Sequence, residues 1–175
     1  NLTLKKGYVS DKELAKKDFL ICRHTLEHIS NPQKFVFELL NKSEIQAIYL
    51  EVPCFSYLVG RNAFYALTYE HCSWYSKKAL SILCNRFDYR VTCFQKKFDE
   101  EYLSIECSKS GKGIGNIEKD IEFNQLRIFC EKYEEFYTKI NTLIMDLHDK
   151  QKTIALWGAA GKGVTLATHI KKAYC

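Results

Sequence analysis

Two short apolar runs on either side of a capped helix constrain the fold of this chain more than any other feature. The first run is D-F-L-I-C at 18–22, and the second is A-I-Y-L-E-V-P at 47–53. Continuous apolar runs of this length are typical of strands that are buried on both faces of a parallel sheet. Between them, Asn31 and Pro32 are residue types preferred at the N-cap and the first position of a helix. The order strand, helix, strand therefore predicts a βαβ unit.

The residues after the second run are expected to form a long irregular loop. Residues 54–76 are rich in aromatic side chains and show no helical or strand period. In an open parallel sheet, ligands bind beyond the carboxyl ends of the strands, so this loop is a candidate binding segment. Ser76 is a candidate N-cap for a following helix. The runs at 87–94 and 101–107 predict two more strands, which are close in sequence and therefore expected to pair antiparallel.

The second half of the chain has a different organisation. Glycines at 111, 113 and 115 indicate a linker. A long amphipathic helix is then predicted from apolar residues that recur four and three apart: Leu126, Cys130, Tyr133, Tyr137, Ile140, Ile144 and Leu147. The segment T-I-A-L-W-G-A-A-G-K-G-V-T-L predicts a strand, a glycine turn and a helix. We expect an α/β sheet domain at 1–110, a linker and long helix at 111–150, and the start of a second α/β domain at 151–175.

The composition disfavours several classes of function. The formal net charge is +5, but the basic residues are scattered, so nucleic acid is not an expected partner. The eight cysteines form no C-x-x-C pair, and several lie in apolar runs, which fits a reduced, cytoplasmic protein. No apolar run approaches the length of a membrane span, so no membrane partner is expected. With nucleic acid and membrane disfavoured, a small molecule is the expected partner. The oligomeric state is not predicted.

The sequence H-T-L-E-H at 24–28 matches the inverted zinc-peptidase motif H-x-x-E-H. Such a motif needs both histidines on one face of a helix. Here it follows directly on a predicted strand, so His24 and His28 are not expected to share an ion, and we predict no metal site. Glu27 and His28 instead leave the strand at the edge of the expected crevice. They either contact a cofactor or substrate there, or are solvated.

The glycine turn G-A-A-G-K-G at 158–163 resembles a phosphate-binding loop only in part. Leu156 stands where the Walker pattern needs glycine, and Gly163 where it needs Ser or Thr. Its backbone N–H groups and helix N-terminus would still suit an anion, with Lys162 adding charge. The alternative is a tight turn that needs glycines.

The stretch T-Y-E-H-C-S-W-Y-S at 68–76 places Glu70 and His71 side by side among aromatic residues. Burying such a pair idle is costly, whereas a site that transfers protons needs these residue types. A surface turn whose aromatic side chains pack inward is the alternative.

The order and spacing of these motifs resemble class I S-adenosylmethionine-dependent methyltransferases. D-F-L-I-C-R-H-T-L-E-H-I and Y-L-E-V-P look like the fourth and fifth strands of that fold. Together with Y-E-H-C-S-W-Y-S and W-G-A-A-G-K-G-V-T-L, they resemble the C-methyltransferases of nucleotide-linked keto-sugars in deoxysugar pathways. The resemblance covers the chain from about Asp18 to its end. It implies an incomplete Rossmann-like methyltransferase sheet, followed by the long helix and the first βα unit of a second α/β domain.

The resemblance also implies that this chain is a piece of a longer protein. The glycine-rich cofactor loop and the zinc domain of the family would lie before Asn1. We therefore expect the fragment alone to bind S-adenosylmethionine poorly and to be inactive.

The resemblance implies specific roles in methyl transfer to a carbon next to a ketone. His71 would be the general base, oriented by Glu70, while the hydroxyls of Tyr69 and Tyr75 would contact the substrate oxygen. The family often has histidine where Tyr69 stands. The nucleotide-sugar side would be Gly161 and Lys162. The cofactor side would be Arg23, His24, Glu27 and His28.

Two alternatives to this function remain open. An O- or N-methyltransferase of small molecules would share the strands but need no base beside a ketone. A non-catalytic, methyltransferase-like binding module would use the long helix at 126–147 for docking.

Overall fold

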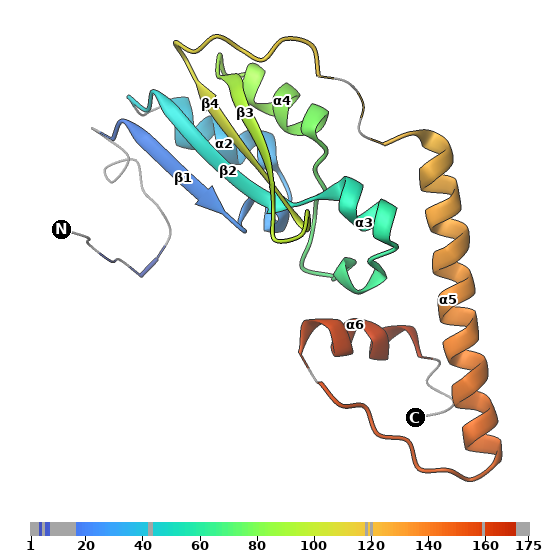
Figure 1. Cartoon of the computed structure of the whole chain (residues 1–175). Helices are drawn as coiled ribbons and strands as arrows, with labels where there is room; N and C mark the ends of the chain where they lie inside the picture. The colour runs from blue at the N-terminus through green and yellow to red at the C-terminus, as the bar shows by residue number, and fades with distance from the viewer. Residues whose placement is uncertain are drawn as a thin grey trace.

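The computed structural model describes residues 4, 6–7, 17–41, 44–117, 119, 121–158 and 160–170. These residues form a mixed α/β fold with an open four-stranded sheet (Figure 1). The strand order across the sheet is β1-β2-β4-β3. The strand bounds are Phe19–Arg23 for β1, Ala47–Pro53 for β2, Arg90–Lys97 for β3 and Tyr102–Ser108 for β4.

The predicted βαβ unit is confirmed. β1 and β2 are parallel neighbours, with Phe19 opposite Ala47 and Arg23 opposite Glu51. The helix α2 (Pro32–Asn41) connects them. Its N-cap is Asn31, whose Oδ1 accepts a hydrogen bond from the Lys34 backbone N–H at 3.0 Å.

The two later strands form the predicted antiparallel pair. β4 lies between β2 and β3 and runs antiparallel to both. β3 begins at Arg90, later than the sequence pattern indicated. The reason is Asp88, whose φ of 61° lies in the left-handed region and is incompatible with a strand.

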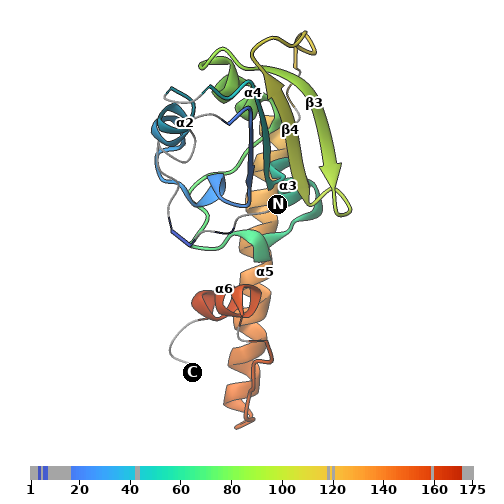
Figure 2. The same cartoon turned by 90° about the vertical axis from the view of Figure 1, so that its left-hand side faces the viewer.

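The core lies between one face of the sheet and two helices, α2 and α4 (Lys77–Asn85), as Figure 2 shows. The predicted cap of α4 is confirmed, because Ser76 Oγ accepts a hydrogen bond from the Ala79 N–H at 3.1 Å. Alternate residues of each strand point into this core. The buried set includes Val36, Leu40, Ile48, Leu50, Val52, Leu80, Leu83, Leu103 and Ile105.

The opposite face of the sheet differs from the prediction. β1 was expected to be buried on both faces, but Phe19 and Ile21 are 52% and 61% exposed among the described residues. That prediction is wrong because β1 is an edge strand, and α2 and α4 both pack against the other face.

The aromatic segment after β2 is more regular than predicted. It begins with the helix α3 (Phe55–Arg61), which ends where Asn62 adopts a left-handed conformation with φ 51°. A 3-10 turn, η2 (Phe64–Ala66), follows. Leu58, Val59 and Phe64 form a second small core with residues of the long helix.

The predicted long helix is confirmed as α5 (Phe123–Asp149), a helix of 27 residues. It lies beside α3 and extends well beyond the sheet (Figure 1). Its buried residues are Phe129, Tyr137 and Ile144, whereas Cys130 is exposed. The predicted apolar seam is therefore correct at Tyr137 and Ile144 and wrong at Cys130. None of the helices in the described part of the chain is long and apolar enough to cross a membrane.

The last predicted βα unit forms only its helix, α6 (Gly161–His169). Residues 152–158 have no regular structure, and Trp157 is fully exposed. A strand needs a neighbouring strand for its backbone hydrogen bonds, and none lies beside this segment in the described parts of the chain. α6 packs against η2, and its last residue, His169, contacts α5, where Tyr133 Oη and His169 Nε2 are 2.5 Å apart.

Candidate functional site

A cavity of about 350 Å³ lies beyond the carboxyl ends of β1 and β2. It brings together segments that are far apart in the sequence: the exit of β1, the aromatic segment after β2, the turn before β4 and the start of α6. Its chemically important lining residues are His24, Glu27, His28, Tyr57, Tyr65, Glu70, His71, Trp74, Tyr102 and Lys162. This position agrees with the expectation that ligands bind beyond the ends of parallel strands.

The exit of β1 turns Glu27 into the cavity. The strand ends at Arg23, because the next residue, His24, has a φ of 47°, and the 3-10 turn η1 (Leu26–His28) follows. The backbone carbonyl of Glu27 accepts hydrogen bonds from the N–H groups of Cys72 at 2.7 Å and Ser73 at 3.2 Å. These bonds fix the 68–76 segment against η1, and so place His71 beside His28.

Glu27, His28 and His71 form a compact cluster. The rings of His28 and His71 lie edge to face, with centroids 5.0 Å apart. His28 Nε2 is 3.9 Å from Glu27 Oε1. One potential donor atom from each of the three side chains lies within 4.8 Å of the others. Two atoms, Glu27 Oε2 and His71 Nδ1, are buried with no hydrogen-bond partner among the residues that the structure describes.

The surroundings of His71 favour its neutral form. Burial lowers the pKa of His71, and the neighbouring His28 lowers it further, while Glu27 acts in the opposite direction. Trp74 packs against the same ring at 5.1 Å. His71 is therefore a neutral imidazole at neutral pH, able to accept a proton.

The opposite wall of the cavity carries hydroxyls and a positive charge. A hydrogen bond with Tyr57, together with burial, raises the pKa of Tyr65 to about 12. Lys162 Nζ lies 4.0 Å from the centre of the Tyr65 ring. Gly161 also lines the cavity. Two residues predicted near a nucleotide-sugar, Gly161 and Lys162, are thus brought to the same cavity as His71.

The glycine turn before α6 has a structural requirement of its own. Gly158 has a φ of 99°, and a Cβ at Gly163 would lie only 1.8 Å from the carbonyl oxygen of Gly158. Both positions therefore need glycine for the turn itself. This geometry accounts for these two glycines without a bound phosphate.

Arg23 and His24 are engaged by a second buried glutamate, Glu51. Its Oε1 accepts hydrogen bonds from Arg23 Nη2 at 2.8 Å and lies 3.0 Å from His24 Nε2, and its Oε2 accepts from the Tyr49 hydroxyl at 2.6 Å. Burial alone would raise the pKa of Glu51, but the hydrogen bonds from Tyr49 and Arg23 outweigh it and lower that pKa. Of the four residues predicted near a cofactor, Arg23 is the one that does not line the cavity.

Two predicted tyrosines also lie outside the cavity. Tyr69 is 85% exposed, and its hydroxyl donates to Glu70 Oε1 at 3.2 Å. Tyr75 is buried, and its hydroxyl donates to the backbone carbonyl of Leu26 at 3.4 Å. Tyr75 therefore anchors the 68–76 segment to η1, and the cavity hydroxyls come from other tyrosines.

Glu101 and Tyr102 belong to the site, although no sequence motif indicated them. They line the cavity because Tyr102 is opposite Pro53 in the sheet, at the end of β2. Predicting this placement requires the register of β4 on β2, for which the sequence has no local signal. By contrast, Tyr57, Tyr65 and Trp74 belong to the aromatic segment that was predicted to contact a ligand.

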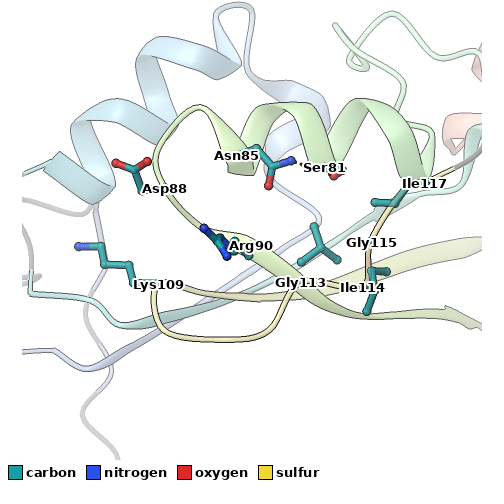
Figure 3. Close-up of a pocket in the computed structure, with 10 residues that line it drawn as sticks. Ser81, Asn85, Asp88, Arg90, Lys109, Gly113, Ile114, Gly115 and Ile117 are labelled. Atoms are coloured by element: carbon teal, nitrogen blue, oxygen red, sulfur yellow. Dashed lines mark hydrogen bonds between the residues drawn. The ribbon is translucent and has the colours of Figure 1, made fainter.

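A second cavity, of about 560 Å³, lies between the end of α4, the start of β3 and residues 113–117 (Figure 3). Asp88 and Lys109 lie at one end of it, and Ser81 and Ile117 at the other. Its charged side chains do not converge on one point, so it is a weaker candidate for a catalytic site.

Comparison with known protein-family models gives no match, and comparison with curated protein sequences gives no significant match either.

Proposed function

We propose that this protein takes part in methyl transfer to a carbon next to a ketone, with a nucleotide-linked sugar as substrate and His71 as general base. One observation carries the proposal: the neutral ring of His71 lines a cavity at the carboxyl end of parallel strands, and its buried Nδ1 has no hydrogen-bond partner among the described residues. A neutral imidazole without a partner is suited to accept a proton from carbon.

The chemistry begins with proton abstraction. The C–H bond beside the ketone breaks, the proton goes to His71, and the electron pair moves to the ketone oxygen to give an enolate. Lys162 and the hydroxyl pair of Tyr57 and Tyr65 supply the positive charge and hydrogen-bond donors of the cavity, which stabilise the enolate oxygen. Glu70 holds His28 in place, because its backbone carbonyl accepts a hydrogen bond from His28 Nδ1 at 3.0 Å.

S-adenosylmethionine would supply the electrophilic methyl group that the enolate carbon receives. His24, Glu27 and His28 line the cavity and would face its reacting end. A volume of about 350 Å³ is near the lower end for a ligand site. The cavity that the described residues form could therefore hold the reacting end of S-adenosylmethionine. It is too small for the whole cofactor together with a nucleotide-linked sugar.

Two features of the fold are compatible with the proposal. According to the resemblance, the first two strands correspond to consecutive strands of the methyltransferase sheet. In the structure, β1 and β2 are parallel neighbours. The resemblance also requires the Glu70-His71 pair to lie at one site with His28, the histidine that follows β1. The rings of His71 and His28 are in contact.

The test is hydrogen–deuterium exchange at the carbon beside the ketone of a nucleotide-linked keto-sugar, followed by NMR in deuterated buffer. This half-reaction needs the base and no methyl donor, so it can be measured on the protein without S-adenosylmethionine. We expect exchange above the uncatalysed rate, and a loss of about 100-fold or more in His71→Phe, the usual contribution of a general base.

The matched control is His148→Ala, which removes a histidine from the exposed face of α5 and should leave the exchange unchanged. Equal exchange in wild type and His71→Phe would refute the role of His71. If labelled S-adenosylmethionine instead transfers its methyl group to oxygen or nitrogen in His71→Phe, the O- or N-methyltransferase alternative is correct.

A further inference from the structure

We propose that Glu27, His28 and His71 form a binding site for one divalent transition-metal ion of the zinc class. This inference goes beyond the proposed function and does not depend on it. It concerns a different set from H-x-x-E-H: the cluster takes His71 in place of His24, whose Nε2 lies 3.0 Å from Glu51 Oε1 and whose Nδ1 lies 3.8 Å from Glu27 Oε1.

The spacing of the three donors suits an ion. Their donor atoms lie within 4.8 Å of one another, and His28 Nε2 is 3.9 Å from Glu27 Oε1. Zinc binds histidine nitrogen and carboxylate oxygen at about 2.0–2.2 Å, so donors around it stand roughly 3.4 Å apart. Each side chain therefore needs to move inward by roughly 1 Å or less, which small side-chain rotations supply.

The second observation is the state of the carboxyl group. The Glu27 side chain is 2% exposed, and its Oε2 has no hydrogen-bond partner in the described chain. Buried carboxylate oxygens are nearly always paired, because leaving one unpaired is costly. An ion bound beside it would satisfy this oxygen.

The histidines already have the arrangement that metal ligands need. His28 Nδ1 donates its hydrogen to the Glu70 carbonyl at 3.0 Å, so the proton is on Nδ1 and the lone pair is on Nε2, on the side of Glu27. The ring of His71 donates a hydrogen bond to the backbone carbonyl of Ala66, while its Nδ1 has no partner among the described residues. Metal-binding histidines characteristically donate their other N–H to a backbone carbonyl, which fixes the ring.

The donor set selects the class of ion. Two imidazoles and one carboxylate suit zinc, cobalt or iron(II), and not calcium or magnesium, which prefer oxygen ligands. The remaining coordination position would face the cavity. Because the ion uses the His71 lone pair, the loaded protein cannot use His71 as a base. Zinc is therefore expected to inhibit the proton abstraction proposed above.

The experiment is a titration of the chelator-stripped protein with cobalt(II), followed by visible absorption, with zinc competition and calorimetry. We expect one ion per chain at micromolar or tighter dissociation constant, and visible bands of low-symmetry cobalt that zinc abolishes. Glu27→Met, His28→Gln and His71→Phe should each weaken binding at least 10-fold, with folding checked by circular dichroism.

The matched control is Cys72→Ser. The Cys72 thiol lies next to the cluster, 3.6 Å from the His28 carbonyl, and is an alternative zinc ligand. Its replacement should leave the affinity unchanged. Dissociation constants above 1 mM, or binding that survives all three ligand variants and disappears in Cys72→Ser, would overturn the proposal. Neither result would affect the exchange test of His71, which is run without metal.

Discussion

Two glutamates that are almost equally buried, Glu27 and Glu51, allow a direct test of how much an unpaired carboxylate costs in folding stability. Glu27 and Glu51 are 2% and 3% exposed, but among the described residues only Glu51 has hydrogen-bond partners for both of its carboxyl oxygens. We expect Glu27→Met and Glu51→Met to change stability in opposite directions in metal-free buffer. Methionine has a similar length and is unbranched, so either site can accept it with little repacking.

The expected magnitudes follow from the contacts. An unsatisfied buried polar group costs about 1–3 kcal/mol, so Glu27→Met should raise the free energy of unfolding by about 1–2 kcal/mol. In a chain of this size that corresponds to a rise in Tm of about 2–8 °C. Glu51→Met loses the bonds to Arg23, His24 and Tyr49. Since the first two partners are partly exposed and regain water, the loss should be about 2 kcal/mol rather than the sum of the bonds.

The assay is urea unfolding followed by circular dichroism, with EDTA present, for wild type and both variants. The reasoning predicts a gap of about 3–4 kcal/mol between the two variants. It is refuted if Glu27→Met is destabilised as much as Glu51→Met, because the Glu27 carboxyl would then be satisfied in the folded protein without a metal.

Two further predictions concern Glu51 and Phe64. The folded-state pKa of Glu51 is lowered, so this carboxylate stabilises the protein above its ordinary pKa of 4.5, and the stabilisation is lost as the pH falls through the lowered value. The difference in unfolding free energy between wild type and Glu51→Gln should therefore be constant near neutral pH and shrink below about pH 4.5; a gap that persists unchanged into strong acid would contradict this. Phe64 packs against Phe129 and Phe136 of α5 at ring distances of 5.1 and 5.4 Å, so Phe64→Ala should cost about 3 kcal/mol in urea unfolding and reduce amide-exchange protection in α5. Unchanged protection in α5 would show that this contact does not hold the helix.

The sequence by itself determined the local elements. Asn31 and Ser76 cap α2 and α4 because their side chains accept hydrogen bonds from the first turn, which depends only on neighbouring residues. The apolar runs determined β1 and β2, and the period of α5 determined its existence and approximate length. Such patterns are local, so they survive without knowledge of the rest of the fold.

The tertiary structure decided how these elements are used. Residues 153–157 have the pattern of a strand but form none, because β structure requires a partner strand. β1 has the pattern of a buried strand, yet its position at the edge of the sheet leaves Phe19 and Ile21 exposed.

The candidate site depends on the same distinction. The sequence indicated Glu27 and His28 as polar residues at the exit of a predicted strand, and His71 as a histidine beside Glu70 among aromatic residues. It also predicted that His24 and His28 do not share a metal ion. The two segments are brought together by hydrogen bonds from the Cys72 and Ser73 backbone N–H groups to the Glu27 carbonyl, from His28 Nδ1 to the Glu70 carbonyl, and from the Tyr75 hydroxyl to the Leu26 carbonyl. These bonds join residues far apart in the chain, and a contact of that kind is set by the packing of the whole fold, since no local spacing specifies it.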